Sequence, residues 1–130
     1  MSRTVTLFVA ALAALVLTAC GGDDGDTSDE SDPTTYGLDV SAPEDGSLEF
    51  EPETLESEPG SIVATFTNPA PIAHDFCVED EGGEEIGCTR IVADGDDSTT
   101  TLELEQGEYT FYCSVAGHRE GGMEGSLTVD

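Results

Sequence analysis

The fold of this chain is decided by one stretch, Ser61-Ile62-Val63-Ala64-Thr65-Phe66-Thr67. This stretch is rich in β-branched and aromatic residues and is interrupted by Asn68-Pro69, so it predicts a central β-strand. Similar short runs, separated by turn residues, lie on both sides of it: 48–50, 54–56, 74–78, 85–92, 99–104, 109–113 and 125–129. Eight short strands at this spacing, with no stretch that keeps a helical period for three turns, predict an all-β antiparallel sandwich or barrel.

The first nineteen residues have the features of an export signal. After a short basic start, residues 5–17 are apolar except for Thr6. Thirteen residues suit the apolar region of a secretory signal and are too few to span a bilayer comfortably. The following Leu17-Thr18-Ala19-Cys20 resembles the bacterial lipobox, so we expect cleavage before Cys20 and acylation of its thiol. The alternative is an ordinary signal peptide with an incidental cysteine.

A polar segment separates this signal from the rest of the chain. Residues 20–35 contain six acidic residues and no large apolar residue, so the segment cannot bury enough surface to order itself. We expect a disordered tether that lifts a single domain, residues 36–130, from the outer face of a bacterial cell membrane.

The charge balance excludes several classes of partner. The chain has 29 Asp and Glu against 3 Arg and no Lys, which gives a formal net charge of -26. A protein that binds nucleic acid by neutralising phosphates needs clustered Lys and Arg, so we expect no nucleic-acid binding. The acidic surface either steers cationic partners or suits a saline habitat, and the sequence leaves both open.

Four metal-ligand side chains stand out near the C-terminus and at one upstream position. Cys113, His118 and Met123 have the spacing Cys-x4-His-x4-Met, and the only other histidine is His74. Two imidazoles, one thiolate and one thioether favour copper in a trigonal site with a weak axial sulfur. Zinc usually takes four strong ligands and has little use for a thioether.

Here the sequence resembles the cupredoxin, or blue type 1 copper, family. The residues that carry the resemblance are 50–55, Pro59-Gly60, Asn68-Pro69, 74–76, 112–118 and 122–125. The resemblance implies an eight-stranded Greek-key β-sandwich, with His74, Cys113 and His118 as equatorial copper ligands and Met123 as the axial one. The spacing from Cys113 to His118 is closer to auracyanin and rusticyanin-like members than to plant plastocyanin.

One position departs from the family pattern. Members often have Asn after the first histidine ligand, where its amide ties the two ligand loops together, whereas this chain has Asp75. A carboxylate accepts hydrogen bonds from loop groups such as Ser114 but donates none. If it faces inward, its charge favours Cu(II) and lowers the reduction potential.

The remaining cysteines, Cys77 and Cys88, are eleven residues apart across Gly82-Gly83. They can face each other on paired strands, and the exported location permits a disulfide, which leaves Cys113 free for the metal. The alternatives are two unpaired buried thiols or additional metal ligands.

Small or apolar residues surround the expected ligands and predict an apolar rim at His118, through which electrons pass to partners. They are Ala70, Pro71, Ile72, Ala116, Gly117, Gly121 and Gly122.

These features favour an electron carrier over an enzyme. Tyr112 and Ser114 flank Cys113, so the His-Cys-His pattern of multicopper oxidases is missing, and no histidine remains for a second copper. We expect a monomeric protein that carries single electrons between redox partners by Cu(II)/Cu(I) cycling. The alternative is an extracytoplasmic copper-binding protein for storage, delivery or sensing.

Overall fold

The computed structural model describes residues 35–130. The predicted signal peptide at 1–19, the lipidated Cys20 and nearly all of the tether at 20–35 lie outside these residues. The described part contains eight strands: β1 (Tyr36–Ser41), β2 (Thr54–Ser57), β3 (Gly60–Asn68), β4 (Cys77–Asp80), β5 (Glu85–Cys88), β6 (Asp96–Leu104), β7 (Gly107–Tyr112) and β8 (Glu124–Val129). Over residues 35–130 no helix has the length and apolarity that a membrane crossing requires.

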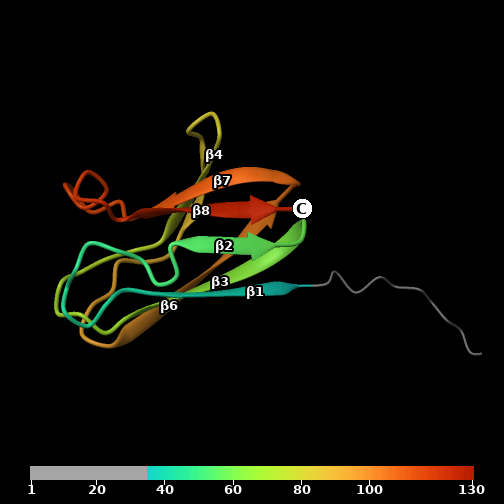
Figure 1. The fold of residues 1–130 in the computed structure, drawn as a ribbon. Coiled ribbons are helices and arrows are strands. Elements are labelled where there is room, and N and C mark those ends of the chain that lie inside the picture. Colours follow the sequence, from blue (N-terminus) through green and yellow to red (C-terminus); the bar gives the residue numbers. More distant parts are fainter. Residues whose placement is uncertain (1–34) are drawn as a thin grey trace, which may run out of the picture. The chain divides into compact units, whose positions relative to one another are not determined.

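The strands form two sheets that pack face to face (Figure 1). One sheet has the order β1-β3-β6 and the other the order β2-β8-β7-β4-β5. Most connections carry the chain from one sheet to the other, and only β4–β5 and β7–β8 are hairpins within one sheet. The predicted all-β sandwich of eight strands is confirmed, but the expectation that it is antiparallel is wrong in part, because β1 pairs with β3 and β2 pairs with β8 in parallel.

The stretch at 61–67 lies within β3, which pairs with β1 on one side and β6 on the other. Alternate residues of this strand, Ile62, Ala64 and Phe66, are fully buried. This period of two is expected for a strand with one face on the core. The prediction of a central strand is therefore confirmed.

Two expectations about individual strands are wrong. Residues 48–50 do not form a strand, and the chain there makes only an isolated bridge between Ser41 and Glu51. The segment lies between Pro43 and Pro52, and a proline has no N–H to donate to a ladder. The first strand is instead β1. It was not predicted because it contains Gly37 and Asp39, and both residue types are rare in strands.

Four phenylalanines form the centre of the core beneath the ligand-bearing end. The ring of Phe50 lies 5.8 Å from Phe66, 5.8 Å from Phe76 and 5.3 Å from Phe111, in edge-to-face contacts. Such aromatic pairs are worth about 0.5–1.5 kcal/mol beyond the area they bury. Phe76 and Phe111 lie two residues from His74 and Cys113, so the core directly supports both segments that carry the expected ligands.

Candidate metal centre

Two segments far apart in the sequence meet at one end of the sandwich. His74 precedes β4, and its backbone exchanges two hydrogen bonds with Val92, of 3.0 and 2.9 Å. Cys113 follows the last residue of β7, Met123 precedes the first residue of β8, and His118 lies in the loop between them. The β7–β8 hairpin therefore presents three of the four predicted ligands together.

The loop from Cys113 to Met123 is held by its own backbone. The N–H of Cys113 donates to the Met123 carbonyl at 3.1 Å, and the N–H of Met123 donates to the His118 carbonyl at 3.1 Å. The Gly121 N–H lies 3.1 Å from the carbonyl oxygens of Gly117 and His118. Gly117 has a φ of 84°, a left-handed conformation that favours glycine. These bonds fix the conformation of the loop.

The structure brings three of the predicted ligand atoms together. The Nδ1 atoms of His74 and His118 lie 3.0 Å apart, and the Cys113 Sγ lies 3.9 Å from the first and 3.6 Å from the second. His74, Cys113 and Met123 are buried, whereas His118 is partly exposed. The backbone of Met123 is hydrogen-bonded to the backbones of the other two loop ligands, Cys113 and His118.

Burial affects the pKa of two of the donor groups. It raises the pKa of the Cys113 thiol. Burial also lowers the pKa of His74, and the neighbouring His118 adds to this effect. Two imidazole nitrogens and a sulfur face one another here, and a cation among them would have all three as ligands.

The donor set fits copper. A thiolate and a thioether hold Cu(I) and imidazoles hold Cu(II), so the mixed set suits both oxidation states. Among residues 35–130 no atom hydrogen-bonds the buried Nε2 of His74. The ring of His74 is therefore oriented by packing and by its own backbone bridge, and its Nδ1 is the atom that faces the other donors.

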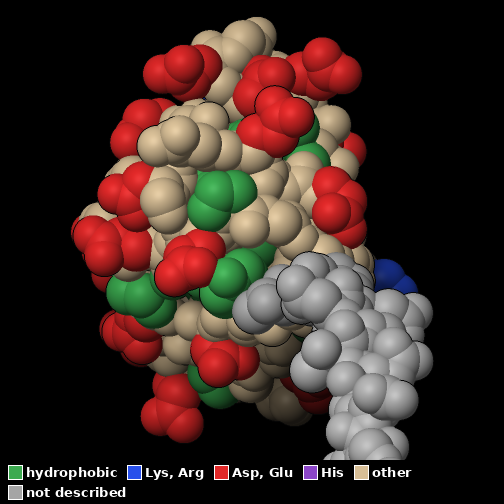
Figure 2. Space-filling view, turned by 90° about the vertical axis from the view of Figure 1, so that its right-hand side faces the viewer, with side chains coloured by type: hydrophobic (Ala, Val, Ile, Leu, Met, Phe, Trp, Pro, Cys, Tyr) green, Lys and Arg blue, Asp and Glu red, His purple; other side chains and the backbone are tan. Residues whose placement is uncertain are grey.

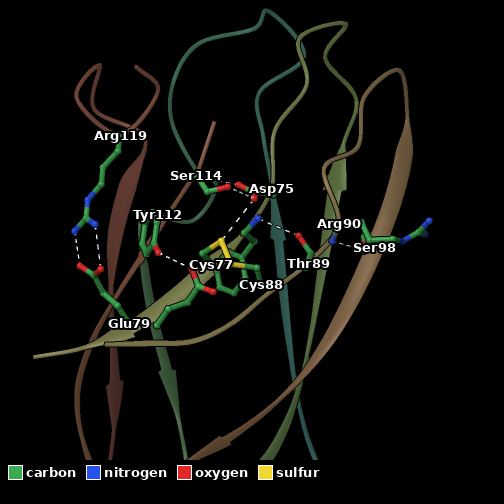
Figure 3. Close-up of a disulfide and its surroundings, with 12 residues drawn as sticks. Asp75, Cys77, Glu79, Cys88, Thr89, Arg90, Ser98, Tyr112, Ser114 and Arg119 are labelled. Atoms are coloured by element: carbon green, nitrogen blue, oxygen red, sulfur yellow. Dashed lines mark hydrogen bonds and ion pairs between the residues drawn. A yellow bond between two sulfur atoms is a disulfide. The ribbon is translucent and has the colours of Figure 1, made fainter. Parts of the chain in front are cut away.

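Asp75 points inward and joins the two ligand segments. Its side chain is buried, and it accepts hydrogen bonds from the N–H of Ser114 at 2.7 Å and from the Ser114 hydroxyl. Figure 3 shows these two residues facing each other across the end of the sheet. Asp75 thus ties the neighbour of His74 to the neighbour of Cys113 through acceptance alone.

Cys77 and Cys88 form a disulfide, as predicted. They are direct partners in the β4–β5 ladder, and their Cα atoms lie 4.0 Å apart. Cys113 remains the free thiol of the described part of the chain. Asp75 lies beside the disulfide, but this second cluster of possible ligands holds no metal because both of its sulfurs are bonded to each other.

The residues of the predicted apolar rim are exposed, with one exception. Pro71, Ile72, Ala116 and the three loop glycines are exposed, and Ile72 retains 43 % of its surface. Ala70 is instead fully buried, because the N–H of Ala70 donates to the Asn68 side chain and the residue turns inward.

Asn68 has a role beyond that of the predicted break after a strand. Its buried side chain donates to the carbonyls of Ile72 at 2.8 Å and Val92 at 2.7 Å, and accepts from the N–H of Ala70 at 3.0 Å. It therefore fastens both the loop before His74 and the residue that bridges His74. The sequence feature that could have indicated this role is an amide side chain, which both donates and accepts hydrogen bonds, at the start of a loop with two prolines.

Solved structures with the same fold include auracyanins and a rusticyanin. Auracyanin B is 18% identical with a TM-score of 0.68, and the match covers 75% of this chain and 90% of that chain. Auracyanin A, described as a "blue" copper protein from Chloroflexus aurantiacus, is 15% identical with a TM-score of 0.66 and coverage of 74% and 99%. Rusticyanin from Thiobacillus ferrooxidans is 20% identical with a TM-score of 0.62 and coverage of 74% and 77%. The Greek-key cupredoxin sandwich that the resemblance implied is thereby confirmed.

The chain also matches the family described as "Copper binding proteins, plastocyanin/azurin family" over residues 38–130. This match spans both ligand segments, and the donor atoms of His74, Cys113 and His118 converge within it. The chain therefore belongs to the plastocyanin/azurin family of copper-binding proteins, and copper is its cofactor.

Proposed function

We propose that this protein carries single electrons between redox partners, outside the cytoplasm and held to a bacterial membrane by lipid on Cys20. Copper, when bound by His74, Cys113, His118 and Met123, supplies the one-electron Cu(II)/Cu(I) couple. The protein acts as a monomer and is not an enzyme.

The observation that carries this proposal is that the donor atoms of His74, Cys113 and His118 converge on one point. The separations of 3.0, 3.6 and 3.9 Å among the two Nδ1 atoms and the Cys113 Sγ require no rearrangement of the chain to surround one ion. A thiolate, a thioether and imidazoles together suit both Cu(I) and Cu(II), which supports one-electron exchange at this site.

His118 provides the route to partners. Its ring is partly exposed while His74 is fully buried, so an electron reaches the protein surface through the His118 ring. The exposed Pro71, Ile72 and Ala116 surround this end with uncharged surface that a partner can approach closely.

A single-copper carrier is supported over a copper oxidase by the count of donors. Both histidines of the chain are already used by this site. In residues 35–130 the remaining two cysteines form a disulfide. The disulfide also supports a location outside the cytoplasm, since such bonds persist in oxidising compartments.

Acidic side chains cover much of the surface. Figure 2 shows them spread over the end where β1 begins and β8 finishes, rather than gathered in one patch. Such a distribution gives long-range attraction to cationic partners, with an association rate that falls as salt is added.

The visible and EPR spectra of the protein loaded with Cu(II) test the proposal. We expect an intense thiolate-to-copper band that disappears on reduction and returns on oxidation, and that Cys113→Ser abolishes. A colourless site that holds only exchangeable Cu(I) would contradict the electron carrier and support copper storage, delivery or sensing.

The membrane anchor is tested separately. We expect Cys20→Ala to leave an uncleaved precursor without lipid, and globomycin treatment to leave an uncleaved precursor. Normal processing under either condition would show that the chain carries an ordinary signal peptide.

A further inference from the structure

Arg119 follows the ligand His118 directly and makes contacts that the copper site itself does not require. Its Nη1 and Nη2 donate to the two carboxylate oxygens of Glu79, at 3.1 and 2.5 Å. Its Nε donates to Glu124 at 3.0 Å, and its Cζ lies 4.4 Å from the centroid of the Tyr112 ring. Figure 3 shows the guanidinium and the Glu79 carboxylate facing each other as two parallel forks.

The three partners of Arg119 lie on three neighbouring strands. Glu79 belongs to β4, Tyr112 to β7 and Glu124 to β8. Tyr112 and Glu124 are direct partners in the β7–β8 ladder, so their side chains point to the same outer face of the sheet. The side chain of Arg119, in the ligand loop, therefore contacts residues of three strands on this face.

Glu79 connects the loop to the other half of the copper site. It lies on β4, the strand that follows His74 and Asp75. The Asp75–Ser114 contact already joins the two ligand segments next to Cys113. The Arg119–Glu79 contact makes a second connection on the side of His118, the ligand that is less buried.

The arrangement is stronger than an ordinary surface ion pair. Exposed pairs contribute about 0–1 kcal/mol, and the better ones are bidentate or belong to a network. The contacts of Arg119 meet both conditions. Its planar guanidinium binds the Glu79 carboxylate in a bidentate pair, and the Glu124 carboxylate accepts a hydrogen bond from Nε. The face of the Tyr112 ring lies beneath the guanidinium. The Glu79 side chain retains only 14% exposure, so solvent screens this pair less than most.

We infer that Arg119 is a positioning residue, which clamps the His118 loop to Glu79 and so keeps the imidazole of His118 at the metal position. The clamp acts in the metal-free protein and persists when copper is bound. The benefit of the clamp for electron exchange rests on the proposed function. The Arg119–Glu79 contact itself does not depend on that function.

Arg119→Gln in the metal-free protein tests the clamp directly. We expect the amide protons of Gly121 and Met123, which lie within bonding distance of the His118 carbonyl, to exchange with solvent about fivefold faster, the equivalent of ~1 kcal/mol. In the copper-loaded protein we expect copper release to a chelator to accelerate by a similar factor. Exchange and release rates equal to the wild-type values would overturn the inference.

Arg90→Gln is the matched control. Arg90 is the other arginine of residues 35–130, it is exposed, and its replacement removes the same charge. We expect wild-type rates from this variant. If it accelerates exchange and release as much as Arg119→Gln does, the effect is one of net charge and the clamp is wrong.

Two further variants separate the bidentate contact of Arg119 from its charge. Arg119→Lys keeps the charge but loses the bidentate geometry, so we expect it to behave like Arg119→Gln; full retention of wild-type rates would overturn the clamp. The effects of Arg119→Gln and Glu79→Gln should not add in the double variant, because both break one contact. Because amide exchange is measured without copper, a wild-type protein that lacks the visible band refutes the proposed function and leaves this test intact.

Discussion

The two segments that carry the metal ligands are held in different ways. The loop from Cys113 to Met123 is fixed mainly by backbone hydrogen bonds among its own residues and by the hairpin beneath it. The segment around His74 has one backbone bridge, to Val92, and otherwise depends on side chains, namely Asn68, Asp75 with its partner Ser114, and the disulfide after it. A local loop survives the loss of one contact better than a segment that depends on a few buried groups.

The largest expected effect comes from removing the disulfide. Cys77→Ala with Cys88→Ala should lower the free energy of unfolding of the metal-free protein by about 2–4 kcal/mol, because the unfolded chain gains conformational freedom. Denaturant unfolding measures the change. A loss below ~0.5 kcal/mol would show that the β4–β5 ladder alone holds the His74 side.

Loss of the Asn68 amide should have the next largest effect. Asn68→Ala leaves the buried N–H of Ala70 without its acceptor and removes a donor from the carbonyls of Ile72 and Val92, of which the Val92 carbonyl keeps the His74 N–H. Unpaired buried groups cost about 1–3 kcal/mol each, so we expect a loss of ~2 kcal/mol after partial rehydration. Asn68→Asp keeps the acceptor for Ala70 but places a carboxylate against two carbonyls, and it should be at least as unstable. Wild-type stability of both variants would contradict the role of Asn68.

Asp75→Asn should change the reduction potential more than the stability. The amide can still accept from the Ser114 N–H and can donate to the Ser114 hydroxyl, so the tie between the segments persists. Removal of the buried negative charge disfavours Cu(II), and we expect a potential higher by roughly 60 mV, a tenfold shift for a one-electron couple. Redox titration of the blue band measures it.

Asp45→Asn is the matched control for this prediction. Asp45 accepts hydrogen bonds from the N–H and the hydroxyl of Ser47, as Asp75 does from Ser114, but it is exposed. We expect its potential to stay at the wild-type value. Equal shifts in the two variants would show that the potential follows net charge rather than the buried contact.

The smallest effect concerns pH. Because burial lowers the pKa of His74 in the folded metal-free protein, the unfolded state binds more protons as pH falls below about 6.5, the ordinary pKa of histidine. The free energy of unfolding should therefore decline below that pH. His74→Gln should flatten this decline, and an unchanged profile in that variant would assign it to other groups.

Several features were predicted from the residues because they are local. The alternation in 61–67, the Cys-x4-His-x4-Met spacing and the two cysteines on either side of a glycine turn each act over a short stretch of chain. The strand at 36–41 was missed because Gly37 and Asp39 lower its propensity while the neighbouring β3 supplies its partner. The roles of Asn68 and Arg119 were missed because their partners are up to 40 residues away in the sequence.

By itself, the sequence determined the chemistry of this protein: which donor side chains exist, which metal they suit and how strongly acidic the surface is. These follow from residue types and short spacings, which any conformation of the chain retains. Only the tertiary structure decided that Asp75 faces inward, that Ala70 is buried and that Arg119 contacts Glu79, 40 residues away in the sequence. Such contacts depend on the packing of two sheets, which brings together residues that have no fixed relation along the chain.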